Sequence, residues 1–188
     1  MNNKNTLILV AGLMAMVFVA ASVFAYYPLN ITVSPTTPPV TFATGSNSNQ
    51  NDLGPGNTIT VTLGSNYASA SVTIHPTYQT TYYKDVLNIT NSDSKAYNVY
   101  IRVDTAITSF PSGSTIQLKI YASNAIRPGT PIATVPLTSP GTVSIGSLGG
   151  GTYWEVDVEV YIPEGTTLPS SATANLHLIY TPSNETPP

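Results

Sequence analysis

The amino-acid sequence predicts an all-β fold built as an antiparallel β-sandwich. Beyond residue 56, short runs alternate apolar and polar residues, the pattern of strands with one buried face. Clusters of Gly, Pro, Asn and Ser separate these runs, as turns between strands do. Past the apolar leader, no window carries a convincing helical period. Several short strands at regular spacing indicate a sandwich or a barrel.

Composition narrows the classes of function. The chain has 188 residues, of which 8% are charged, and its formal net charge is −3. Its six Lys and Arg residues are scattered and form no basic patch, so we expect no nucleic acid as a partner. The chain has no cysteine, which excludes disulfides and cysteine metal sites. Core packing or assembly must therefore hold the domain together.

The first element is an apolar leader at residues 1–25. Residues 6–25 carry no charge, and "VFA" before Tyr26 is a small-residue cleavage pattern. We interpret the leader as a signal peptide removed after Ala25, so that the chain meets the membrane only before cleavage. An uncleaved membrane anchor is the alternative, because 20 apolar residues are enough to span a bilayer.

The second element, residues 26–45, has the alternation of an extended strand. Its apolar positions are Leu29, Ile31, Val33, Val40 and Phe42. Prolines interrupt it and lack an N–H to donate, so we expect two short ladders, at 29–33 and 40–43. The Gly- and Asn-rich residues 46–56 then predict a flexible linker to the domain.

This segment is long enough to leave its own domain. Residues 26–43 span about 60 Å when extended, against roughly 40 Å for the width of the remaining domain. A lone strand is unstable in water, and burying five apolar groups contributes about 7–15 kcal/mol before ordering costs. Pairing with an edge of the same chain gives a monomer. Pairing with the next chain gives a head-to-tail fibre.

Residues 57–181 are predicted to form the sandwich, and the Pro-rich tail at 182–188 is expected to fray. The clearest strand is "YWEVDVEVYI", in which Trp154, Val156 and Val158 alternate with acidic residues and should face the core. The nine predicted strands span residues 57–63, 68–74, 85–90, 97–104, 115–121, 132–135, 143–145, 153–162 and 172–180.

Glu155, Asp157 and Glu159 form a row of carboxylates on one face of that strand. Such a row could bind Ca²⁺ if a neighbouring element added oxygen ligands. Alternate residues lie about 7 Å apart along a strand, which is wide for one ion. We therefore expect a solvated face with Arg102 or Lys119 opposite as cross-strand ion pairs, and no metal or cofactor.

Little in the sequence points to catalysis. His75 and His177 fall out of phase with their apolar neighbours, which places both on solvent faces. No metalloprotease His-Glu-x-x-His helix and no Gly-x-Ser-x-Gly elbow occurs, and we expect the chain not to be an enzyme. Twelve tyrosines could form a sugar-binding platform, but we favour cross-strand packing, because aromatic residues are common in strands.

Three sequons make glycosylation a further prediction. They begin at Asn30, Asn88 and Asn184, and in a secreted chain each is a candidate for an attached glycan. A glycan on Asn30 would require the segment around it to keep one exposed face, in agreement with its alternation.

One stretch resembles a known family. "NYASASVTIHPTYQTTYYKDVLNITNSDSKAYNVYIRVD", residues 66–104, is similar to the core signature of TasA-type biofilm fibre proteins and the related archaeal bundling pilins. It departs from the family at "HPTYQ", where the family has a Pro-Gly turn, and it lacks the long charged insertions of the bacterial members. The matching positions are Ser69 to Val72, Pro76, Lys84 and Asp85, Val86 to Ile89, Asn91, and Val99 to Val103.

The resemblance implies a jelly-roll-like sandwich completed by an N-terminal donor strand, here residues 26–45. It implies a pilin of an extracellular, cell-surface filament in a biofilm matrix, with other copies of the chain and neighbouring filaments as partners. Some members are classed as peptidases, but this chain has no metal-ligand set for that activity. The alternative is a monomeric surface domain, membrane-anchored or secreted, that binds carbohydrate; a secreted hydrolase has the least support. Carried onto this sequence, the donor residues are Leu29, Ile31, Val33, Val40 and Phe42.

Overall fold

The computed structural model describes residues 3–4, 24–127 and 129–188. The chain divides into two units, residues 1–36 and 37–188. Of the predicted signal peptide, residues 1–2 and 5–23 lie outside the described residues. Within the part of the chain that is described, no helix is long and apolar enough to cross a membrane.

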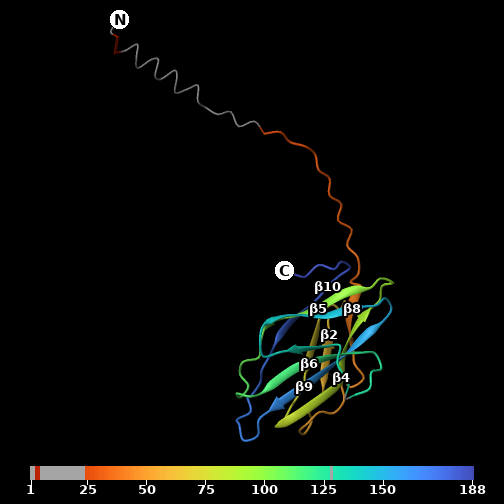
Figure 1. The fold of residues 1–188 in the computed structure, drawn as a ribbon, viewed down its shortest axis with the longest axis vertical. Coiled ribbons are helices and arrows are strands. Elements are labelled where there is room, and N and C mark those ends of the chain that lie inside the picture. Colours follow the sequence, from red (N-terminus) through yellow and green to blue (C-terminus); the bar gives the residue numbers. More distant parts are fainter. Residues whose placement is uncertain (1–2, 5–23, 128) are drawn as a thin grey trace. The chain divides into compact units, whose positions relative to one another are not determined.

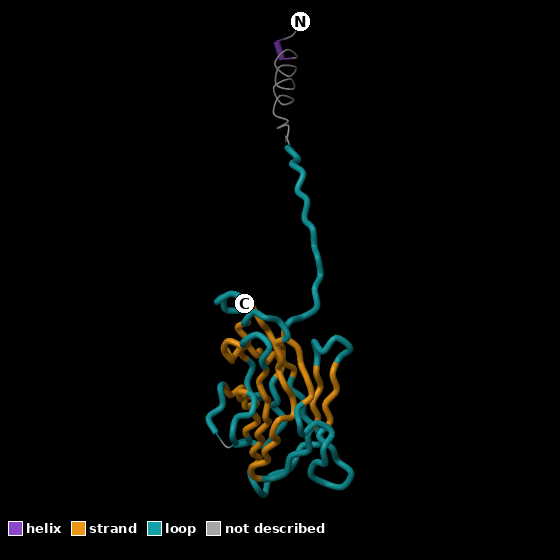
Figure 2. The backbone as a smooth tube through the Cα atoms, turned by 90° about the vertical axis from the view of Figure 1, so that its right-hand side faces the viewer, coloured by secondary structure: helices purple, strands orange, loops and turns teal. Residues whose placement is uncertain are grey.

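The second unit consists of antiparallel sheets packed as a sandwich (Figures 1 and 2). The largest sheet has the order β1-β4-β9-β6-β7, a second has the order β10-β5-β8, and β2 pairs with β3. The strands are β1 (Val40–Thr44), β2 (Thr60–Leu63), β3 (Ala70–Thr73), β4 (Gln79–Asn91), β5 (Tyr97–Thr105), β6 (Thr115–Ala122), β7 (Ala133–Pro136), β8 (Gly141–Leu148), β9 (Tyr153–Ile162) and β10 (Asn175–Thr181).

The core lies between the sheets and uses the apolar faces that the sequence predicts. Val156, Val158 and Val160 of β9 are at most 5% exposed, and Val99, Ile101 and Val103 of β5 oppose them with the same degree of burial. Burying each such side chain contributes about 1.5–3 kcal/mol. With no disulfide available, this packing carries the stability of the fold.

The nine strands predicted beyond residue 56 are all present, and β9 has the predicted bounds. The largest difference is in β4, which begins at Gln79 rather than Asp85. Its first half, "QTTYYK", has no clear alternation. A bulge also shifts its register with β9 between Tyr83 and Leu87 and breaks the pattern a second time.

Residues 46–56, which the sequence predicts to be a flexible linker, make hydrogen bonds to the sandwich. The backbone N–H of Asn47 donates to the carbonyl of Asp85 at 3.1 Å, and Asn51 forms an isolated bridge with Thr58. Asp52 accepts hydrogen bonds from the backbone N–H of His75 at 2.7 Å. Gly and Asn clusters fit tight turns as well as linkers, and here they make turns that belong to the sandwich.

The Pro-rich tail at 182–188, which the sequence predicts to fray, contacts the sandwich in this structure. Its backbone carbonyls accept hydrogen bonds from side chains on the outer face of β5. Asn98 donates to Ser183 at 2.8 Å, and the Tyr100 hydroxyl donates to Glu185 at 3.1 Å. Proline removes donors from a chain but leaves the carbonyls free, so side-chain donors can hold a Pro-rich segment.

Candidate self-assembly site

Residues 24–36 form no strand, and their apolar side chains are exposed. Leu29, Ile31 and Val33 are 80%, 76% and 80% exposed. Large apolar side chains at alternate positions have the pattern of a half-buried strand, but here no partner covers them. These three side chains are exposed in the way that the apolar face of a strand is exposed when no neighbouring strand covers it.

Val40 and Phe42, the other two predicted donor residues, lie elsewhere. Both belong to β1, which pairs with β4 of the same chain through Val40↔Asn91 and Phe42↔Ile89. Val40 is 2% exposed, and Phe42 packs against the core. The ladder expected at 40–43 is thus an edge of the chain's own sheet, and only the stretch at 29–33 has no partner among the described residues.

Most sheet edges of the sandwich are protected from strand addition. At the free edge of β1, the N–H of Phe42 donates to the carbonyl of Tyr67 at 2.8 Å. β7 has four residues and ends in a proline. β8 has a register shift with β5 opposite Val99 and Tyr100, and its Gly146 has a φ of 127°. Short, bulged or covered edges resist pairing with another chain.

The free edge of β10 lacks these protections. From Leu176 to Thr181 it pairs with β5 residue for residue, and the only shift lies at its start. Outside the regular ladders, none of the backbone hydrogen bonds found among described residues involves β10. Leu176, Leu178 and Tyr180 pack against the core but are only half-buried. β10 therefore offers free backbone groups beside incompletely covered apolar side chains.

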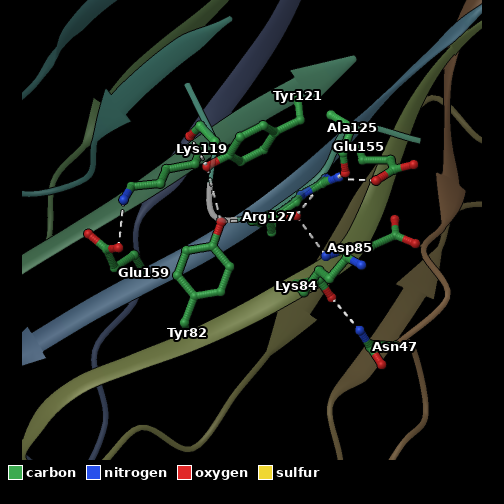
Figure 3. A network of polar contacts seen from close by, with 12 residues as sticks. Asn47, Tyr82, Lys84, Asp85, Lys119, Tyr121, Ala125, Arg127, Glu155 and Glu159 are labelled. Carbon is green, nitrogen blue, oxygen red and sulfur yellow. Dashed lines mark hydrogen bonds and ion pairs between the residues drawn. The ribbon is translucent and has the colours of Figure 1, made fainter. Parts of the chain in front are cut away.

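The row of carboxylates on β9 is buried rather than solvated, which corrects the sequence prediction. Glu155 and Asp157 are 7% and 0% exposed. Arg127, from the loop after β6, covers them: its Nη2 lies 2.6 Å from Glu155 and its Nε lies 3.0 Å from Asp157 (Figure 3). Glu159 forms an ion pair with Lys119 at 2.6 Å, and Lys119 is one of the two partners that the sequence predicts. The other predicted partner, Arg102, pairs with Asp104 instead.

Two tyrosines complete this cluster. Tyr82 donates from its hydroxyl to Asp157 at 2.6 Å, and the Arg127 guanidinium lies 4.3 Å from the centre of the Tyr121 ring. Burial, and then the hydrogen bond to Asp157, raise the pKa of the Tyr82 hydroxyl. Burial alone would lower the pKa of Arg127, but the hydrogen bonds and charges of Asp157 and Glu155 raise it. The cluster therefore keeps its neutral tyrosine and its charged arginine at any ordinary pH.

Only weak signs of this cluster are visible in the sequence. Arg127 lies in "RPGTP", which reads as a turn, and nothing near it in the sequence is acidic. The partner carboxylates lie about thirty residues further on, so only the paired strands bring them together. Asp85 is also buried, at 8% exposure, and nothing in its sequence context predicts this burial.

The other candidate residues differ in accessibility. Asn30 and Asn184 are exposed, so their sequons stay predictions that their positions permit. Asn88 lies between β1 and β9, and its amide nitrogen, the atom that a glycan would need, donates to the Thr44 carbonyl at 3.3 Å. That contact makes Asn88 the least favourable of the three positions.

The histidines and tyrosines are mostly engaged in structural contacts. The His75 side chain is 38% exposed, and its Nδ1 lies 3.0 Å from the Asp52 carboxylate, whose side chain is 1% exposed. His177 is exposed, as predicted, and contacts Asp104. Tyr97 packs edge-on against Tyr180. In the described part of the chain, no three His, Cys, Asp or Glu residues are placed to hold a metal together.

Compared with known proteins, the chain matches no protein-family model and no curated protein.

Proposed function

We propose that the chain is a pilin, the structural subunit of an extracellular filament that grows by donor-strand complementation. The observation that carries the proposal is the exposure of Leu29, Ile31 and Val33 in a strand-patterned segment. Exposed apolar groups in such a row mark an interaction site. The resemblance of residues 66–104 to TasA-type fibre proteins and archaeal bundling pilins points to the same mode of assembly.

The energetics favour insertion into another copy. Covering three large apolar side chains contributes about 5–9 kcal/mol before the cost of ordering the segment. Ladder hydrogen bonds along a free edge add to this because they satisfy backbone groups on both strands. A donor that occupies the next subunit leaves its own acceptor open for the preceding one, so the contact repeats without closing.

We assign the acceptor to the free edge of β10. This strand has seven residues, enough to pair with all of 29–33, and its inward row alternates at the same period. Placed beside it, Leu29, Ile31 and Val33 extend the apolar row of Leu176, Leu178 and Tyr180. The second sheet then gains a fourth strand opposite the five-stranded sheet.

Lateral association into bundles fits the outer surface. With 8% charged residues, neighbouring filaments meet little like-charge repulsion. Apart from Ile179, the outer faces of β5 and β10 carry polar side chains, among them the ion pair of Arg102 and Asp104. We therefore place the protein in a bundled, cell-surface filament.

Electron microscopy of the mature chain, residues 26–188, tests polymerisation. We expect filaments from this chain, none from residues 37–188, and none from an Ile31→Lys variant. Thr32→Lys is the matched control, since Thr32 alternates onto the opposite face and its change should leave filaments intact. Equal assembly of Ile31→Lys and the control would contradict the proposal.

Cysteine pairs test the acceptor. Because the natural chain has no cysteine, Ile31→Cys with Leu178→Cys gives one defined cross-link, and pairing two central residues works for either strand direction. Oxidation should give a ladder of covalent oligomers, whereas Ile31→Cys with Val143→Cys on β8 should not. A cross-linked monomer would show that the segment folds onto its own edge, and the chain would then be a monomeric surface domain.

A further inference from the structure

A polar cavity, separate from the proposed donor and acceptor strands, opens beside the buried carboxylates of β9. It has a volume of about 440 Å³, within the range of roughly 300–1,000 Å³ that is usual for small-molecule sites. Its walls come from the turn after β1, the bulge of β4, the loop after β6 and the start of β9. The lining consists of a buried charged group and an outer group of polar side chains.

The buried charged groups already satisfy one another. Both oxygens of Glu155 are occupied: Oε1 accepts a hydrogen bond from the backbone N–H of Asn124 at 2.8 Å, and Oε2 lies 2.6 Å from Nη2 of Arg127. Asp85 Oδ2 accepts a hydrogen bond from the backbone N–H of Ser46 at 2.8 Å, and its Oδ1 is buried and does not reach the cavity surface. These groups form a fixed base and leave no buried charge open to a ligand.

The charges that line the cavity also balance. Asp85 and Glu155 are negative, and Lys84 and Arg127 are positive. A charged ligand would bring an uncompensated charge to these walls and displace the water around it, which is costly. The lining therefore favours a neutral ligand that forms several hydrogen bonds.

The outer part of the cavity supplies such hydrogen-bonding groups. Ser46 and Asn124 contact the carboxylates through their backbone N–H groups, and Lys84 accepts a hydrogen bond through its carbonyl. Among the described residues, no hydrogen bond or ion pair engages the side chains of these three residues or the hydroxyl of Tyr153. Together they provide donors and acceptors, and the Tyr153 ring adds an apolar face.

The backbone fixes two of the lining residues in position. Asp85 and Asn124 have φ angles of 44° and 60°, in the left-handed region that few residues other than glycine adopt. Hydrogen bonds to buried carboxylates hold both: the N–H of Asp85 donates to Asp157 at 2.7 Å, and that of Asn124 donates to Glu155 at 2.8 Å. Backbone held in this way is typical of ligand sites, and groups that are already fixed lose little freedom when a ligand binds.

We propose that this cavity binds a neutral sugar. The Asn124 amide, the Ser46 hydroxyl and the Lys84 ammonium bond to its hydroxyl groups, and the Tyr153 ring lies against its C–H face. A sugar suits this lining because each of its hydroxyls both donates and accepts, and because it carries no charge. Ser46, Lys84 and Asn124 are exposed, so the cavity is open to a sugar unit of a polymer as well as to a free sugar. If the chain is a pilin, as proposed above, the site attaches each subunit to surrounding carbohydrate.

Saturation-transfer difference NMR on the mature chain, residues 26–188, tests the site with glucose, galactose and mannose as probes. We expect at least one of them to bind saturably with a Kd of about 1–10 mM, the range for a ligand of about a dozen non-hydrogen atoms. The amino-sugar and uronic-acid forms of the sugar that binds should bind more weakly, because each carries a charge. The absence of saturable binding for all three probes, or tighter binding of a charged form, would overturn the proposal.

A matched pair of variants locates the binding. Asn124→Gly removes the amide but keeps the left-handed backbone, which glycine adopts freely. Asn49→Gly is the control, because Asn49 has a φ of 62° in an exposed turn and does not line the cavity. We expect Asn124→Gly to weaken binding about threefold to tenfold and Asn49→Gly to leave it unchanged.

A second pair repeats the comparison with a hydroxyl group. Tyr153→Phe should weaken binding, whereas Tyr161→Phe, on the same strand but outside the cavity lining, should not. Equal affinity in both variants and their controls would place the sugar elsewhere and overturn the assignment.

Two further samples define the ligand and separate the site from assembly. A neutral polymer of the sugar that binds, such as dextran for glucose, should displace the monosaccharide if the ligand is a polymer and leave it bound if the ligand is a free sugar. Both results retain a neutral sugar. The Ile31→Lys variant should bind the sugar as tightly as the natural chain, because the cavity includes no residue of the donor segment. The sugar site and the pilin can therefore fail separately.

Discussion

At the scale of single residues, the outer face of β9 depends on Arg127. Its side chain is 7% exposed, and it is the cation over Glu155 and Asp157, which are as deeply buried. Removing one partner of a buried ion pair leaves the other charge without compensation, which costs far more than the pair contributes. The ion pairs of Arg127 therefore attach the loop after β6 to β9.

We expect Arg127→Ala to lower the free energy of unfolding by about 3–5 kcal/mol. Arg102→Ala removes a pair that is 38% and 34% exposed, and it should cost less than about 1 kcal/mol. Urea denaturation of both variants measures the difference. Similar losses of unfolding free energy in the two variants would show that the buried ion pairs of Arg127 matter no more to stability than the exposed pair of Arg102.

The pair of Lys119 and Glu159 should make stability depend on pH. Burial of Glu159 favours its neutral form, but hydrogen bonds from Lys119 and Gln117 outweigh this and lower its pKa below the ordinary 4.5. A carboxyl whose pKa is lower in the folded state stabilises the fold above its unfolded pKa. That contribution is lost as the pH falls through the folded value.

Lys119→Met should therefore cost about 1 kcal/mol at neutral pH. The gap between the variant and the natural chain should narrow as the pH falls from 4.5 toward about pH 3. Urea denaturation over this range checks it. A gap that stays constant down to the lowest pH would show that Lys119 acts through packing of its alkyl chain instead.

At the scale of elements, Gly45 fixes how β1 leaves the sheet. A Cβ atom at this position would lie 2.1 Å from the Asp85 carbonyl oxygen, so the chain passes the bulge of β4 too closely for any side chain. We expect Gly45→Ala to destabilise the fold by about 1–3 kcal/mol. Gly149→Ala is the control, because its nearest neighbour would lie at an ordinary 3.5 Å. Thermal unfolding of the two variants distinguishes them.

The elements also show what the sequence could predict. β9 follows its pattern residue by residue because a strand covered by apolar side chains on one face alternates strictly. The same pattern assigned Glu155 and Asp157 to solvent, because periodicity gives the face of a residue but not what covers that face. Arg127, from a loop distant in sequence, covers this face. Val40 and Phe42 show the same alternation as Leu29. Their pairing with β4 in the structure, which the pattern does not predict, is what assigns them to the chain's own sheet.

At the scale of the whole molecule, the proposed assembly separates the chain into a donor and an acceptor. Residues 37–188 form a compact unit that contains β1 and the free edge of β10. Residues 26–36 hold the exposed apolar row. If donor-strand insertion drives polymerisation, the two parts should recombine when they are supplied as separate molecules.

A synthetic peptide of residues 26–36 should therefore bind the unit of residues 37–188 and raise its Tm. A ligand that binds only the folded state stabilises it by about 2.7 kcal/mol when its concentration is a hundred times its Kd. The same peptide with Ile31→Lys should have no effect, since a charge would enter the apolar row. Saturation with the peptide should also stop the mature chain from adding to filament ends, because it occupies the acceptor edge without offering a new one. A peptide that leaves both the Tm and filament growth unchanged would contradict assembly by this segment.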